Sequence, residues 1–169
     1  MADVYKEQLI KKIPDTKDTL KRVGIIFAVM LILVGSMTII PQFGIFITFA
    51  AGFGAYIVLG RLKKEFEYSV TNGELDIDVI YNKSNRKRLF TGNIKDFEVM
   101  AHVEDTSHEN MLSTAQEKKD YSSGTVSERS YIFLTNYNGK KQSIIIEPND
   151  EILQEMRKLL SRQKFHPKK

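Results

Sequence analysis

The feature that most constrains this chain is a run of 38 consecutive residues, Val23 to Gly60, without a charged side chain or a histidine. Because 27% of all residues are charged, a gap of this length indicates a segment that avoids water. The tripeptide 41–43 divides it into two apolar runs, 23–40 and 44–60. At about 1.5 Å per residue, each run forms a helix nearly as long as the ~30 Å hydrocarbon core of a bilayer. The sequence therefore predicts a transmembrane helical hairpin.

A buried hairpin in the core of a soluble protein is the alternative interpretation of residues 23–60. Both runs are apolar on every side, and the remaining chain is too small to surround two such helices. A cleaved signal peptide fits poorly, because the uncharged segment is too long and continues into a second run. The transmembrane hairpin is therefore the expectation.

The charges that flank the hairpin predict its orientation. Residues 1–22 contain six basic side chains, and Arg61, Lys63 and Lys64 follow the second run, whereas the connecting turn contains none. Basic residues collect on the cytoplasmic side of membrane proteins. We therefore expect a plasma-membrane protein with both termini in the cytoplasm: an N-terminal segment 1–22, the hairpin, and a cytoplasmic domain 61–169. The absence of cysteine excludes disulfides and agrees with a reducing compartment.

Small residues recur at helical spacing within the hairpin. The pairs are Gly24 with Ala28, Ala50 with Gly54, and Ala51 with Ala55. Such pairs let two helix backbones approach closely in lipid. They either pack the two helices of one hairpin together or form the contact of a homo-oligomer, and the sequence leaves both interpretations open. Neither run contains an ionisable residue, so an ion or proton pathway is not expected.

Apolar and polar residues alternate after residue 64, which predicts antiparallel strands. Strands at 65–70 and 74–81 flank Asn72-Gly73, and strands at 131–137 and 140–146 flank Asn138-Gly139. Asn-Gly is the strongest short signal for a hairpin turn, because both turn positions require positive φ. The remaining predicted strands are 86–90 and 94–102.

A helix after Pro148 is predicted to cover the open side of this sheet. It begins with capping and acidic residues, and its apolar side chains form one stripe: Ile152, Leu153, Met156, Leu159 and Leu160. Residues 103–130 are polar and aperiodic, so we expect a mobile loop around at most one short element.

Three stretches resemble the bacterial pleckstrin-homology-like (PH-like) membrane proteins. They are FEYSVTNGELDID (Phe66 to Asp78), RKRLFTGNIKDFEVM (Arg86 to Met100), and the last strand with its helix (Ser143 to Leu160). The opening MADVYKEQLIKK and the stretch VTNGELDID are also similar to a family of uncharacterised small two-helix membrane proteins of Gram-positive bacteria. The resemblance implies an α+β membrane protein in which a partly open antiparallel β-barrel, with a C-terminal capping helix, follows the hairpin. It does not imply specific phosphoinositide binding, because the first hairpin turn, Thr-Asn-Gly-Glu, carries no basic residue.

Four basic residues, Lys83, Arg86, Lys87 and Arg88, lie within six positions of one predicted hairpin. If this hairpin faces the bilayer, each gains on the order of 1 kcal/mol from anionic lipid headgroups. The alternative is a solvated strand end whose charges only prevent edge-to-edge pairing. These four residues are the candidate contacts for a lipid or a protein partner.

One cluster of the sequence suggests a metal site: His102, Glu104, Asp105, His108 and Glu109. A divalent ion needs convergent ligands, and these residues fall in the predicted loop, so we interpret them as polar loop residues and expect no metal and no other cofactor. The sequence contains no Gly-x-Ser-x-Gly elbow and no phosphate-binding glycine-rich loop, so an enzyme is not expected.

The function expected from these patterns is a membrane-anchored cytoplasmic interaction module that binds an unknown protein partner and anionic lipid. A structural organiser of membrane oligomers and an accessory subunit of a transporter or envelope enzyme are the alternatives. Nucleic acid is not an expected partner, because the net charge of +4 divides equally between residues 1–22 and residues 61–169.

Overall fold

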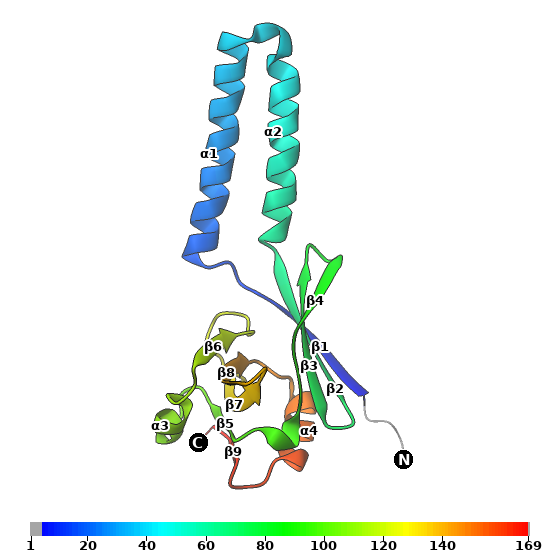
Figure 1. The fold of residues 1–169 in the computed structure, drawn as a ribbon, viewed down its shortest axis with the longest axis vertical. Helices are drawn as coiled ribbons and strands as arrows, with labels where there is room; N and C mark the ends of the chain where they lie inside the picture. Colours follow the sequence, from blue (N-terminus) through cyan, green and yellow to red (C-terminus); the bar gives the residue numbers. More distant parts are fainter. Residues whose placement is uncertain (1–4, 169) are drawn as a thin grey trace. The chain divides into compact units, whose positions relative to one another are not determined.

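The computed structural model describes residues 5–168, which divide into two compact units (Figure 1). The hairpin unit contains residues 14–64 and 81–85. The β-domain contains residues 5–13, 65–80 and 86–168. The chain therefore leaves the β-domain once for the long hairpin and a second time for the short turn at 81–85.

The hairpin unit is built from two antiparallel helices, α1 (Thr16–Ile39) and α2 (Pro41–Arg61) (Figure 1). The Asp15 side chain caps α1 by accepting a hydrogen bond from the Thr16 amide. Ile40 alone separates the two helices. The next residue, Pro41, can begin α2 because proline is tolerated at the first helical position, where its missing N–H costs no hydrogen bond. The second helix therefore begins at residue 41, ahead of the predicted run 44–60.

The two helices approach each other closely beside the turn. A Cβ atom at Gly44 would lie 3.0 Å from the Ser36 carbonyl oxygen, so any larger residue would require the backbone to shift. The Ser36 hydroxyl lies 3.2 Å from the Gly44 carbonyl and 3.2 Å from the Thr48 hydroxyl. These polar groups satisfy one another within the hairpin.

Very little of either helix is buried within the structure. In the most apolar 18-residue window, 0% of α1 and 6% of α2 is buried. Both helices are long and apolar enough to cross a membrane. A hairpin in a soluble core would be covered on most sides, so the structure does not support that alternative.

The β-domain contains a four-stranded sheet and a five-stranded sheet in its described residues. The first has the order β1-β2-β3-β4, with β1 (Tyr5–Lys11), β2 (Lys64–Thr71), β3 (Glu74–Tyr81) and β4 (Asn85–Asn93). The second has the order β6-β8-β7-β5-β9, with β5 (Val99–His102), β6 (Glu117–Asp120), β7 (Tyr131–Tyr137), β8 (Lys140–Ile146) and β9 (Phe165–His166). Both Asn-Gly dipeptides form the predicted turns, with positive φ at Asn72, Gly73, Asn138 and Gly139.

The N-terminal segment supplies a strand that the sequence did not reveal. Strand β1 pairs antiparallel with β2, in a register that runs from Tyr5 opposite Thr71 to Lys11 opposite Glu65. The segment 1–22 is therefore more than a cytoplasmic lead-in to the hairpin, because part of it belongs to the β-domain. Its Gln8 side chain joins the two sheets by donating to the Glu147 carbonyl at 3.0 Å.

The expectation of a partly open, wholly antiparallel barrel needs correction. The described strands form two separate sheets without closing into a barrel, and two pairings are parallel, β5 with β9 and β6 with β8. The predicted strand 94–102 is shorter than expected and begins as a single 3-10 turn, η1 (Ile94–Asp96). The reason is local, because the Asn93 side chain caps this turn at the Lys95 amide.

Residues 103–130 contain more than the one short element that was expected of them. The segment contains η2 (Thr106–His108), α3 (Glu109–Leu112) and β6. Its polar side chains are not simply solvated, because Ser122 and Ser130 are buried and hydrogen-bonded within the segment. Backbone bonds from Gln116 to the Lys141 carbonyl and from Tyr121 to the Ile145 carbonyl extend the pairing with β8.

Aromatic rings fill the core of the β-domain. Phe97 and Phe133 stack with ring centroids 4.1 Å apart, and Phe90 meets Phe133 edge-on at 5.6 Å. The final helix, α4 (Asp150–Leu159), packs on β1 and η1 and buries Ile152 and Met156, so the prediction of a C-terminal covering helix is confirmed.

Replacing Tyr68 by phenylalanine should lower the free energy of unfolding by about 1–3 kcal/mol, because two buried polar groups lose their partner. The buried Tyr68 hydroxyl donates to the Tyr121 carbonyl at 2.5 Å and accepts from the Glu147 amide at 3.3 Å. Urea unfolding of the detergent-solubilised protein, followed by near-ultraviolet circular dichroism, measures the change. The exposed Tyr5 is the matched control, and equal losses in Tyr68→Phe and Tyr5→Phe would contradict the prediction.

Candidate functional site

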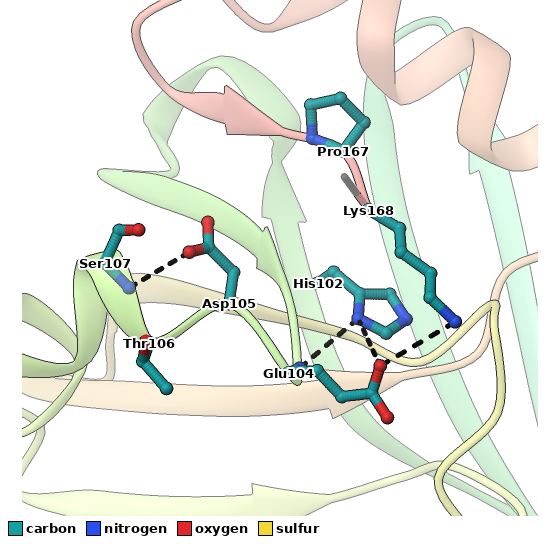
Figure 2. Close-up of a pocket in the computed structure, with 7 residues that line it drawn as sticks. All are labelled: His102, Glu104, Asp105, Thr106, Ser107, Pro167 and Lys168. Carbon is teal, nitrogen blue, oxygen red and sulfur yellow. Dashed lines mark hydrogen bonds and ion pairs between the residues drawn. The ribbon is translucent and has the colours of Figure 1, made fainter.

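The β-domain contains an open cavity of about 340 Å³ where two distant parts of the chain meet (Figure 2). The lining residues are His102, Glu104, Asp105, Thr106, Ser107, Pro167 and Lys168. The parallel pairing of β5 with β9 brings these parts together, because it places Met100 opposite Phe165 and Ala101 opposite His166. The end of β5 and the residues after β9 then form opposite walls.

His102 forms the buried floor of this cavity and is 1% exposed. Its Nδ1 accepts a hydrogen bond from the Glu104 amide at 3.3 Å, so Nδ1 carries no proton in this arrangement. Nε2 therefore carries the proton and donates it to the Ser127 carbonyl at 3.2 Å. Both ring nitrogens are thus engaged with the backbone, which makes His102 a structural residue that holds the cavity wall.

Asp105 organises the rim of the cavity. Its carboxylate accepts a hydrogen bond from the Ser107 amide at 3.0 Å (Figure 2). The carboxylate also lies 3.3 Å from Nδ1 of His108. Hydrogen bonds from Ser107 are the main cause that lowers the pKa of Asp105 to about 2, so the group is ionised at neutral pH. The His108 ring stacks on His166 with centroids 3.7 Å apart, which fastens η2 to β9.

A second hollow of about 490 Å³ shares four of these residues and extends the surface over the histidine pair. The shared residues are Asp105, Ser107, Pro167 and Lys168. Lys168 lies 3.7 Å from Glu104 and 3.7 Å from Glu128, so its charge is balanced. The combined surface presents hydrogen-bonding groups and balanced charges beside apolar atoms of at least equal extent.

The structure gives the predicted polar cluster a location that the sequence did not. Of its five residues, His102, Glu104 and Asp105 line the cavity, His108 borders the adjoining hollow, and Glu109 begins α3. Among residues 5–168, no group of three His, Asp or Glu side chains converges in a way that could hold a metal ion. The missing signal was the parallel β5–β9 pairing, which no local pattern predicts.

The four predicted basic contacts fall into two classes. Arg86 contacts Glu67 at 2.5 Å, and Arg88 contacts both Asp76 and Asp78 at 2.5 Å. The acceptors Glu67 and Asp78 are only 5% and 3% exposed. Burial raises the pKa of Glu67, and the Arg86 guanidinium opposes that shift. The two arginines therefore compensate buried carboxylates, which leaves them little free charge for a partner.

Lys83 and Lys87 remain exposed and form no ion pair within the described part of the chain. Lys83 occupies the turn between β3 and β4 with a φ of 60°, next to Asn82 with a φ of 50°. Lys87 lies on strand β4 between the two paired arginines. The sequence placed all four basic residues in one group, and only these two lysines keep an unpaired charge.

The predicted small-residue pairs also separate. Ala51 and Ala55 are half-buried and lie on the same face of α2 as Thr48, which contacts α1. The other two pairs are exposed: Gly24, Ala28, Ala50 and Gly54. A Cβ atom added at either exposed glycine would meet no atom within 4 Å. Only one of the three pairs is therefore used within the hairpin.

Replacing Arg88 by methionine should lower the free energy of unfolding by about 2 kcal/mol, because the buried Asp78 carboxylate loses its closest charged partner. The neighbouring Lys87→Met is the matched control and should change it by less than about 0.5 kcal/mol, because Lys87 is exposed and unpaired in residues 5–168. Urea unfolding in detergent measures both variants. Similar losses in the two would show that the Arg88–Asp78 contact contributes nothing specific.

Comparison with known proteins supplies one match. Residues 2–166 match the family described as Bacterial PH-like domain (DUF6106). No curated protein and no solved structure matches the chain. The match extends over the N-terminal strand, the hairpin and the β-domain, so the hairpin is part of the family pattern. It confirms the resemblance to bacterial PH-like proteins, and the chain belongs to the bacterial PH-like domain family DUF6106.

Proposed function

We propose that this protein is a membrane-anchored interaction module whose β-domain binds a protein partner on the cytoplasmic face of the plasma membrane. The observation that carries the proposal is the hairpin of two apolar helices, uncharged from Val23 to Gly60, which the rest of the chain leaves almost entirely uncovered. Apolar helix surface of this extent is stable when lipid covers it. The match to a PH-like domain family supports an interaction role for the remaining residues.

The cavity beside His102 is the proposed binding place for a short polar segment of the partner. Its rim presents the ionised Asp105 together with the exposed side chains of Thr106 and Ser107. Small-molecule sites are mostly enclosed, whereas this surface is open and carries polar groups along its rim. A domain held at the membrane also meets a membrane-bound partner at raised effective concentration, so the contact does not need to be strong.

A second candidate function is the organisation of membrane oligomers. The observation that favours it is the exposure of four small residues: Gly24, Ala28, Ala50 and Gly54. A Cβ atom added at either of the two glycines would meet no atom within 4 Å. Small residues of this kind allow close approach of a helix from a second copy. An accessory role beside a transporter or envelope enzyme is compatible with either candidate.

The absence of cysteine makes the topology directly testable. We expect a single cysteine at Gln42, next to the hairpin turn, to react with a membrane-impermeant maleimide on intact cells. A cysteine at the exposed Lys118 of β6 should react only after the cells are permeabilised. The reverse pattern, or equal reactivity at both positions, would overturn the proposed orientation, and release of the protein by alkaline carbonate would overturn the anchor itself.

Photocrosslinking tests the proposed partner site. Benzoylphenylalanine in place of Thr106, on the cavity wall, should capture one discrete protein from living cells. The same residue in place of Thr71, which is exposed at the end of β2 in the other sheet, is the matched control. Identical products from the two positions, or no protein product from Thr106, would contradict a partner at the cavity.

A further inference from the structure

The positive charge of this protein is concentrated in the hairpin unit. Residues 14–64 and 81–85 contain seven basic and two acidic residues, a net charge of +5. The rest of the chain contains 18 basic and 19 acidic residues, a net charge of −1. The entire positive excess of the protein therefore belongs to the unit that contains the two apolar helices.

The basic side chains of the two units also differ in their partners. Every ion pair that the structure gives for residues 5–168 joins residues of the β-domain. The basic residues of the hairpin unit form none within that range: Lys17, Lys21, Arg22, Arg61, Lys63, Lys64 and Lys83. These seven side chains and the two acidic residues of the unit leave it a net charge of +5. The β-domain instead pairs nine of its 17 described basic side chains and contains more acidic than basic residues.

These basic residues lie at one end of the hairpin. Lys17, Lys21 and Arg22 occupy the start of α1, and Arg61 is the last residue of α2. Because the helices are antiparallel, the start of one and the end of the other face the same way (Figure 1). Lys63 and Lys64 lie two and three residues after the end of α2.

Lys83 joins this group through the fold and not through the sequence. The Asn82 amide donates to the Lys63 carbonyl at 3.2 Å, and the Asn82 carboxamide would lie 3.4 Å from a Cβ atom at Gly60. The Lys64 ammonium lies 6.0 Å from the centre of the Tyr81 ring. The turn at 81–85 is therefore docked on the end of α2, and it holds Lys83 beside the basic residues that follow the helix.

We propose that these seven residues, the basic collar, bind the headgroups of anionic phospholipids. This inference rests on the proposed insertion of the hairpin. Unpaired basic groups at the end of an apolar helix pair meet the headgroup layer once lipid covers the helices. The charges are spread over two helix ends and one turn, which suits a layer of headgroups better than one enclosed ligand. The collar replaces the sequence-based set at Lys83, Arg86, Lys87 and Arg88, of which only Lys83 remains.

Native mass spectrometry of the full-length protein with equimolar phosphatidylglycerol and phosphatidylcholine tests the collar. We expect the wild type to retain phosphatidylglycerol preferentially. Lys83→Asn should reduce that preference by up to about fivefold, because the loss of one basic residue near the membrane surface weakens binding to anionic lipid by about this factor at low salt. Asparagine is chosen because it tolerates the positive φ of this turn. The matched control is Lys87→Asn, which removes an exposed charge outside the collar and should leave the preference unchanged.

A second variant keeps the test independent of the turn. Arg61→Gln combined with Lys63→Gln and Lys64→Gln should reduce the preference further than Lys83→Asn does, since it removes three collar charges. Equal retention of both lipids by the wild type, or equal effects of Lys83→Asn and Lys87→Asn, would overturn the proposal. Insertion is measured separately by maleimide labelling at Gln42, so an inserted protein without lipid preference would refute the collar alone.

Discussion

The pairing of β1 with β2 is the interaction on which the rest of the structure depends. The two strands are adjacent in the sheet, yet the whole hairpin lies between them in the sequence, and the ladder ends at Lys11 opposite Glu65. Closing a segment of this length has an entropic cost that the ladder and the contacts around it must offset. The hairpin is therefore an insertion between two neighbouring strands, tied to the β-domain at both ends. This explains why one family pattern extends from residue 2 to residue 166 instead of covering a domain with a separable anchor.

The parts of the fold that the sequence predicted are those with a local physical cause. Both Asn-Gly turns, the two long helices and the covering helix follow from φ preferences and from apolar periodicity. Strand β1 was missed because Leu9 and Ile10 are adjacent in an otherwise polar segment, which hides the alternation. Two parallel pairings were missed, β6 with β8 and β5 with β9, because no local pattern encodes a partner that is distant in the sequence. The regular structure within residues 103–130 depends on such pairings and on buried serines. The polar composition of the segment predicted a loop instead.

Charge was the property whose meaning changed most between sequence and structure. The sequence analysis offered the arginines of β4 as candidate contacts for a lipid or a protein partner. In the structure, Asp78 is 3% exposed and Arg88 contacts it at 2.5 Å. A buried carboxylate requires a charged partner, so the burial of Asp78 and its contact with Arg88 depend on each other. The converse holds for Lys83, whose position beside the end of α2 depends on a backbone hydrogen bond that the sequence could not indicate.

The unequal division of charge bears on how such a protein works at a surface. A β-domain with a net charge of −1 gains little net attraction to an anionic leaflet, whereas the hairpin unit with +5 gains much. In the proposed arrangement the hairpin unit carries out the attachment, and the β-domain is held by a covalent link and not by adsorption. In this proposal the residues assigned to anchoring and those assigned to partner binding therefore belong to different units of the chain.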